Sequence, residues 1–178
     1  MATSFYFIGS ELQDFQSLLN VASDTTYIRP GYARAGVFLD YGGTRFAEGW
    51  FSAPVSKFWF TTRVRILFSG RVGGTDRSYF DFYDGDIKRL SVIMKPGENV
   101  FQLTSYADGV TETVLATSTD TYDFLSTGGV NKLDAFVDYS ANGRFALYMN
   151  GVLVAEYVGN LIAGGSTTLS RFRLRCPS

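Results

Sequence analysis

Aromatic and charged residues alternate along two segments of the sequence in a pattern that suits the recognition of sugars. Tyr79, Asp81 and Tyr83 occupy alternate positions in one segment, with Arg77 before them, and Arg63 and Arg65 alternate in an earlier one. Alternate side chains of a strand share a face. Tyr rings can stack on sugar faces, while Asp and Arg can hydrogen-bond sugar hydroxyls. If the two segments are adjacent, they form a glycan-binding groove; otherwise such pairs simply stabilise a sheet.

A second candidate site is acidic. Asp84, Gly85 and Asp86 follow Asp81 closely, and their carboxylate oxygens could bind Ca²⁺. The alternative is an ordinary Asp-Gly turn between one strand that ends at Tyr83 and another that begins at residue 87. No further run of oxygen ligands follows, so both interpretations stay open.

The sequence contains no histidine and a single cysteine, Cys176. Without histidine there can be no Ser-His-Asp or Cys-His nucleophile pair and no His-containing zinc site. Acid–base chemistry would have to use carboxylates, Lys, Tyr or this cysteine. We therefore expect a binding or structural role and no enzymatic activity.

The overall composition argues against two further classes, nucleic-acid-binding and membrane-spanning proteins. The 178 residues carry 16 Lys and Arg against 17 Asp and Glu, giving a formal net charge of −1. This length predicts one compact domain. A near-neutral chain is not expected to bind nucleic acid through bulk electrostatics. No apolar run approaches the ~20 residues of a membrane span, so we expect no membrane insertion.

Most of the chain shows the two-residue period of antiparallel strands. Apolar residues alternate with polar or outward ones in four clear segments, which contain Val64 and Ile66, Phe80 and Phe82, residues 133–139, and Phe172 and Leu174. In residues 133–139 the outward set is Asp134, Phe136 and Asp138. Turn signals recur at short intervals, and the strongest are two Asn-Gly pairs at 142–143 and 150–151. Together these predict a three-strand meander over about 131–157 within an all-β sandwich or barrel.

The N-terminal third is less regular. Ser10 and Gln13 form a capping-box pattern, and Leu12, Phe15, Leu18 and Leu19 form an apolar stripe, which predicts a short helix or turn. We expect residues 1–34 to form an N-terminal attachment segment with an irregular stretch over 22–34. A strand over 35–41 then opens the sandwich domain, residues 35–178.

Two further patterns concern the faces of the strands. In Trp50-Phe51 and Phe58-Trp59-Phe60 alternate rings are expected in the core. If both faces of these strands are covered, the outward rings could mark an oligomer contact or insertion against another sheet. Arg171, Arg173 and Arg175 share one strand face. We expect them to pair with Asp134 and Asp138 across neighbouring strands.

The meander resembles a known family. Residues 130–139 and 143–154, with the sequence Tyr148-Met149-Asn150-Gly151, resemble the concanavalin-like jelly roll of laminin-G-type and legume-lectin-like domains. Residues 58–66 are similar to the strand that opens the family's second sheet. The resemblance covers about residues 35–176 and implies a concanavalin-like, two-sheet antiparallel jelly-roll sandwich. Laminin-G-type domains often hold calcium at the rim, which is the only cofactor that the resemblance suggests.

The N-terminal segment resembles a narrower group. Residues 5–15 and the step at 31–34 look like concanavalin-like proteins of tailed-phage structural modules. This implies a non-enzymatic virion protein, such as a head decoration, spike, fibre or tail component, that is made in the host cytoplasm and oligomerises. Its partners would be other virion proteins, with a host-surface glycan as an additional ligand. The residues expected to dock on the particle or to contact other subunits are apolar: Phe5, Phe7, Ile8 and Phe15.

Catalytic members of the superfamily use residues that this sequence does not contain. Glucanases of the family carry a Glu-x-Asp-x-Glu strand, and the five glutamates here never adopt that spacing. Jelly-roll lyases that use a Gln-x-His strand need a histidine. The alternatives to the virion role are a carbohydrate-binding, lectin-like module and, less favoured, a polysaccharide-cleaving enzyme.

Overall fold

The computed structural model describes residues 17–19, 21–24, 35–38, 45–64, 77–95, 100–120, 131–162 and 164–176. Its strands are β1 (Ser17–Leu19), β2 (Val21–Asp24), β3 (Ala35–Phe38), β4 (Arg45–Val55), β5 (Lys57–Val64), β6 (Arg77–Asp84), β7 (Ile87–Lys95), β8 (Val100–Tyr106), β9 (Glu112–Thr117), β10 (Asn131–Asp138), β11 (Gly143–Met149), β12 (Val152–Gly159) and β13 (Leu169–Cys176).

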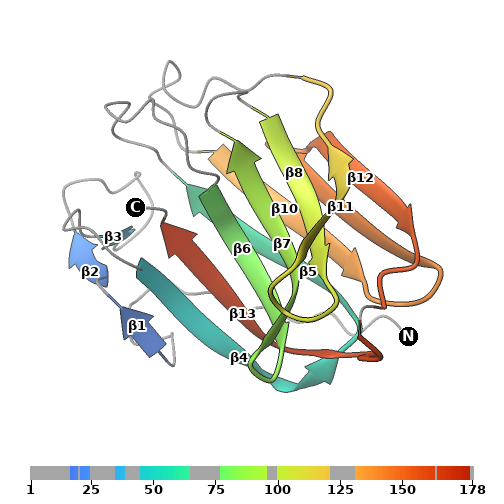
Figure 1. The fold of residues 1–178 in the computed structure, drawn as a ribbon. Coiled ribbons are helices and arrows are strands. Elements are labelled where there is room, and N and C mark those ends of the chain that lie inside the picture. Colours follow the sequence, from blue (N-terminus) through green and yellow to red (C-terminus); the bar gives the residue numbers. More distant parts are fainter. Residues whose placement is uncertain are drawn as a thin grey trace.

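These strands form two large antiparallel sheets that are stacked on one another (Figure 1). The larger sheet has seven strands in the order β1-β4-β13-β6-β7-β8-β9, and the smaller has four in the order β12-β11-β10-β5. Strands β2 and β3 pair separately. The arrangement confirms the predicted all-β, two-sheet antiparallel sandwich. Among the described residues no helix is long and apolar enough to cross a membrane.

The core between the sheets is built from the apolar set of each alternating strand. Phe80 and Phe82 of β6 face Phe58 and Phe60 of β5, with ring centroids 5.2–5.6 Å apart in edge-on contacts. Phe172 of β13 packs against the same group. Each such ring removes a large apolar area from water, which is the main stabilising contribution to a sandwich of this kind.

A glycine makes room for this aromatic cluster. Gly49 of β4 lies opposite Phe172 of β13 in the sheet register. A Cβ atom at Gly49 would overlap the Phe172 ring. The Phe172 ring therefore packs directly against the backbone of residue 49, where any side chain larger than that of glycine would collide with the ring.

The two Asn-Gly pairs have different backbone conformations. Asn150 and Gly151 both have positive φ, 53° and 87°, as a type I′ turn requires, so the predicted tight hairpin between β11 and β12 is confirmed. Asn142 and Gly143 have no positive φ, and β10 and β11 are joined by a longer connection. Glycine is needed at 143 because a Cβ atom there would overlap the carbonyl oxygen of Asp138.

The N-terminal prediction needs a correction. The apolar stripe predicted a helix that would include Leu18 and Leu19, yet Ser17–Leu19 form β1 and pair with β4 at the edge of the seven-stranded sheet. Part of the expected irregular stretch forms β2, and the strand predicted over 35–41 is described as β3, Ala35–Phe38. Pairing with an existing strand outweighs the local helical pattern. Residues 1–16 lie outside the described part, and the division at residue 34 stays a prediction.

Arg89 is a buried residue at one end of the sandwich, next to two of its connections. It occupies a bulge in β7, because Phe82 pairs with Leu90 and Tyr83 pairs with Lys88. Its buried guanidinium donates to the carbonyl of Ala107, at 2.6 Å, and lies beside Gly164. The β8–β9 and β12–β13 connections thus meet at one buried cation, which also lies 3.8 Å from the Asp84 carboxylate at the end of β6.

Candidate functional site

The outer face of the seven-stranded sheet contains the predicted Asp81 and Tyr83, but both side chains are buried. Asp81 is 0% exposed and accepts hydrogen bonds from the hydroxyls of Ser91, at 2.7 Å, and Tyr83, at 3.2 Å. Tyr79 lies on the same strand, and its side chain is outside the described part, as is that of Arg77. Asp81 and Tyr83 do share a face, as the alternation predicted, but a sugar cannot reach them there.

The two arginines predicted to complete the groove are not brought beside this strand. Arg63 belongs to β5 in the four-stranded sheet, whereas Asp81 belongs to β6 in the other sheet. Arg65 lies outside the described residues. The prediction of a composite groove therefore assumed a strand pairing that the fold does not have. Alternation determines which side chains share a face but leaves open which strands are neighbours.

Arg171 and Arg173 of β13 converge on Glu48 of β4. Their guanidinium nitrogens lie 3.3 Å and 2.6 Å from the two Glu48 oxygens, and all three side chains are mostly buried. The Arg171 guanidinium also lies between the rings of Trp50 and Tyr83, 4.9 Å and 4.5 Å from their centroids. The partners predicted for these arginines, Asp134 and Asp138, lie in the other sheet and pair with lysines instead.

A chain of hydrogen bonds continues across this face toward β9. The Tyr106 hydroxyl donates to Glu112, at 2.8 Å, and lies 3.3 Å from the Thr104 hydroxyl. Burial is the main cause that raises the pKa of Tyr106 far above its usual range, and the adjacent Glu112 carboxylate adds to it. Tyr106 therefore stays protonated and is a poor general base. This face is suited to holding the sheet together.

The acidic turn pairs with arginines. Gly85 has a φ of 56°, and Asp84 and Asp86 lie 3.8 Å and 3.3 Å from the guanidinium nitrogens of Arg89 and Arg171. The described residues include no cluster of three or more acidic, His or Cys side chains that could hold a metal ion. The turn interpretation accounts for this segment, and calcium binding stays a prediction. The predicted docking residues, Phe5, Phe7, Ile8 and Phe15, lie outside the described part.

The outer face of the four-stranded sheet presents an accessible group of rings. Trp59 of β5, Phe136 of β10 and Tyr148 of β11, here called the aromatic platform, come from three adjacent strands. The Trp59 centroid lies 4.9 Å from that of Phe136 and 5.6 Å from that of Tyr148. Trp59 is 50% exposed, so half of its large side chain remains available to a ligand.

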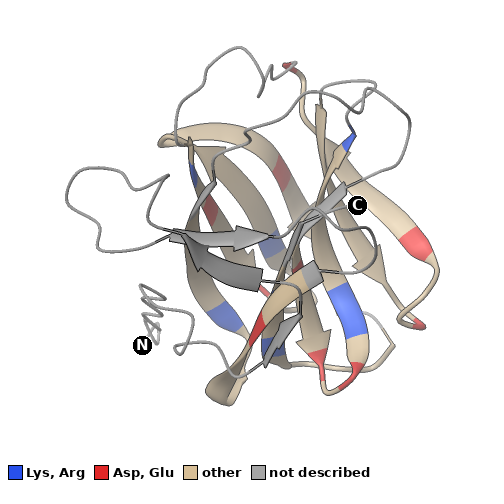
Figure 2. Cartoon of the chain, turned by 90° about the vertical axis from the view of Figure 1, so that its left-hand side faces the viewer, with Lys and Arg blue, Asp and Glu red and all other residues tan. Residues whose placement is uncertain are grey.

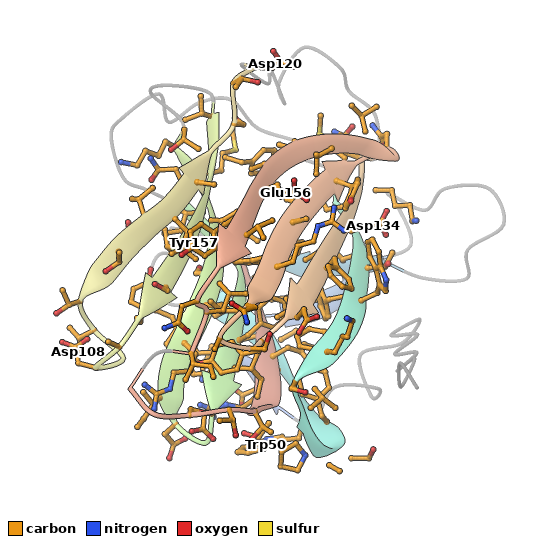
Figure 3. All side chains as sticks on the ribbon, turned by 90° about the vertical axis from the view of Figure 1, so that its right-hand side faces the viewer. Trp50, Asp108, Asp120, Asp134, Glu156 and Tyr157 are labelled. Atoms are coloured by element: carbon orange, nitrogen blue, oxygen red, sulfur yellow. The ribbon has the colours of Figure 1, made fainter. Side chains whose placement is uncertain are left out.

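Charged side chains surround the aromatic platform in pairs. Lys57 bonds Asp138 at 2.6 Å, and Lys132 bonds Asp134 at 2.9 Å. Arg144 pairs with Glu156, whose hydrogen bond is the largest cause that raises the pKa of Arg144 above its ordinary value. Asp134 and Glu156 are labelled in Figure 3 on strands of this sheet, and Trp50 lies toward the lower end of the molecule.

The sequence predicts an outward position for one member of the aromatic platform, Phe136, but not the platform itself. The alternation in residues 133–139 places Phe136 in the outward set, but it leaves open whether Trp59 or the phenylalanines beside it point outward. The contact of Trp59 with Phe136 depends on the pairing of β5 with β10, which sets the two residues opposite each other across a long stretch of sequence. No local pattern encodes that register.

No protein-family model matches the chain, and no curated protein matches it in sequence. Its structure is similar to that of an endo-β-1,4-glucuronan lyase from the fungus Trichoderma reesei, with a TM-score of 0.64 and 11% identity; the match covers 90% of this chain and 78% of the lyase chain. It is also similar to a protein of unknown function with a galectin-like fold from Bacillus subtilis, with a TM-score of 0.51, 10% identity, and coverage of 93% and 86%.

These identities are low, so the likeness concerns the fold alone. Neither of these structures is described as a virion protein, and the phage resemblance gains no support from them. The resemblance to jelly-roll sandwiches does gain support, because both structures align over most of this chain. The chain has the fold of the concanavalin-like, galectin-like class of antiparallel sandwiches.

Proposed function

We propose that this protein is a non-enzymatic carbohydrate-binding module and that the aromatic platform is its sugar-contacting surface. The observation that carries the proposal is the position of Trp59, which is half exposed on β5, the edge strand of the four-stranded sheet, and which contacts two further rings. Large exposed apolar groups on a folded surface are typical of interaction sites.

The chemistry of the platform suits a sugar. The C–H faces of a pyranose ring can pack on an indole ring, and its hydroxyls then need hydrogen-bonding partners at the edge of that ring. Lys57 and Arg144, which lie over the Phe136 ring, and the carboxylates paired with them supply donors and acceptors beside Trp59. Ligand sites combine an apolar surface with a few polar groups in the same way.

The fold is compatible with this role. One similar structure is an endo-β-1,4-glucuronan lyase, and the other has a galectin-like fold. For this chain we infer binding without cleavage, since the carboxylates beside the platform are tied to cations and the sequence has no Glu-x-Asp-x-Glu strand. Incubation with polysaccharide should release no new reducing ends and no unsaturated products.

The virion role and the oligomer stay predictions. The residues expected to mediate docking lie outside the described part, so the structure offers no argument for or against them. An oligomer contact through Trp59 is the main competitor for the same surface. Light scattering on the wild type and on Trp59→Ala separates the two. If Trp59 contacts a sugar, the substitution leaves the mass of the assembly unchanged. If Trp59 contacts another subunit, the mass falls.

A glycan array followed by calorimetry tests the proposal. We expect saturable binding to at least one glycan, weakened about tenfold or more by Trp59→Ala, since central aromatic contacts dominate binding energies. Trp50→Ala is the matched control, because Trp50 is similarly exposed on the opposite sheet, and it should leave binding unchanged. Absence of binding to all glycans, or equal losses for the two variants, would overturn the proposal.

A further inference from the structure

We propose that the ligand of the aromatic platform is a single chain of a neutral glycan, and neither an acidic polysaccharide nor a crystalline polysaccharide surface. This inference rests on the proposed function and narrows its ligand class. Two observations carry it: the balance of charge around Trp59 and the angles between the three rings.

The described charges around the platform cancel. Each of the cations Lys57, Lys132 and Arg144 has its own carboxylate within ion-pair distance, and these are the ion pairs among the described side chains of this face. Arg63 of β5 lies opposite Lys132 in the strand register, and its side chain is outside the described part. In the strand register, Asp138 lies between Lys57 and Arg144, so the signs alternate across adjacent strands. Figure 2 shows that Lys and Arg positions are interspersed with Asp and Glu positions along the described strands.

This alternation disfavours an acidic ligand. A uronate chain crossing the platform would bring its carboxylates close to Asp134, Asp138 and Glu156 as often as to the three cations. Like charges in proximity cost free energy, and the cations could respond only by giving up their present partners. Neutral hydroxyls face no such conflict. They can donate to the carboxylates and accept from the cations while the ion pairs persist.

The ring angles disfavour a crystalline surface. The plane of Trp59 is inclined by 49° to that of Phe136 and by 42° to that of Tyr148. Three rings so inclined cannot lie flat against one planar array of sugar chains. Trp59 offers one stacking face, and the neighbouring rings form its inclined sides. A single chain can follow this shape, because successive sugar units turn relative to one another.

The experiment compares three probes on the full chain by calorimetry and pull-down. They are soluble neutral hexasaccharides of glucose, mannose and xylose, soluble oligoglucuronate, and insoluble microcrystalline cellulose. We expect at least one neutral hexasaccharide to bind, with a dissociation constant that stays within about twofold as NaCl rises from ~0.05 to ~1 M, because screening does not act on an uncharged ligand. Oligoglucuronate should bind at least about tenfold more weakly, and cellulose should retain no protein.

A charge variant makes the test sharper. Glu156→Gln removes one carboxylate from the rim and leaves Arg144 without its acidic partner, so oligoglucuronate binding should rise about threefold or more and should weaken with added salt. Asp120→Asn is the matched control, because it removes an exposed carboxylate in a region that Figure 3 places away from Glu156. The control should leave oligoglucuronate binding unchanged.

The outcomes separate this inference from the proposed function. Tighter, Trp59-dependent binding of oligoglucuronate, or retention on cellulose, would overturn the inference and leave a carbohydrate-binding module in place. Failure of every probe and of the glycan array would overturn the proposed function itself.

Discussion

Trp50 and Trp59 occupy the same kind of position in the two sheets, each next to a phenylalanine that points into the core, and each is about half exposed. Trp50 covers the guanidinium of Arg171, whose charge is balanced by the buried Glu48. Trp59 contacts two other rings, and the partly exposed Lys57 and Arg144 lie over the neighbouring Phe136 ring. The comparison teaches that burial of the charged partners, more than residue type, distinguishes a stabilising sheet face from one that is free to bind.

The largest expected effect comes from breaking the buried network. Glu48→Ala leaves two mostly buried arginines without their shared carboxylate, and such a loss costs about 3–5 kcal/mol of the free energy of unfolding. Glu156→Ala breaks an exposed pair on the other face and should cost at most about 1 kcal/mol. Urea denaturation measures both. Similar costs for the two variants would contradict the distinction between the faces.

A smaller loss of stability is expected from overpacking at Gly49, the residue before Trp50. Gly49→Ala places a methyl group against the Phe172 ring, and overpacking of this kind costs about 1–3 kcal/mol. Thermal unfolding gives the cost. Ser52→Ala, at an exposed position of the same strand, is the control and should stay within about 0.5 kcal/mol. If Gly49→Ala is as stable as this control, the Phe172 ring does not depend on the glycine.

The hairpin that carries part of the four-stranded face gives a third test. Asn150 has a φ of 53°, and its side chain accepts a hydrogen bond from the Lys132 amide at 2.9 Å. Asn150→Ala should cost about 1–2 kcal/mol, because alanine tolerates positive φ poorly and the hydrogen bond is lost. Asn142→Ala, at the other Asn-Gly pair, should cost less. Chemical denaturation measures the loss of stability in both variants. If Asn142→Ala costs more than Asn150→Ala, the assignment of the two turn types is wrong.

The smallest effect concerns a turn of the seven-stranded sheet. The exposed Asp108 carboxylate accepts hydrogen bonds from Thr111 and Val110, and the Thr111 hydroxyl is the main cause that lowers its pKa to about 2. A pKa lowered in the folded state contributes stability above the unfolded value, near ~4, and that contribution is lost as the pH falls toward 2. NMR titration of the Asp108 carboxyl should give this low midpoint.

Amide exchange provides the corresponding variant test. Asp108→Asn should speed exchange at Val110 and Thr111, whose amides donate to Asp108, and Asp120→Asn should not. An unshifted Asp108 pKa with unchanged exchange would show that this carboxylate does not hold the turn.

Local patterns predicted a large part of the fold. The alternation around Phe80 and Phe82 identified core residues, and Asn150-Gly151 identified a tight turn, because both depend on neighbours within a few residues. The pairing of β5 with β10 is not a local property, so the sequence did not reveal that Arg63 and Asp81 lie in different sheets. The burial of Asp81 was also missed, since its hydrogen bonds come partly from another strand.

The order of strands in the larger sheet has a consequence for how the protein is made. Strand β13 is the last in sequence, yet it lies between β4 and β6 and pairs with both (Figure 1). During synthesis, the β6–β9 hairpins and the β10–β12 meander can form as they emerge, because their contacts are local. The two halves of the larger sheet cannot join until residues 169–176 have left the ribosome. A nascent chain stopped before β13 would expose two unpaired strand edges and the core position of Phe172, which makes it prone to aggregation.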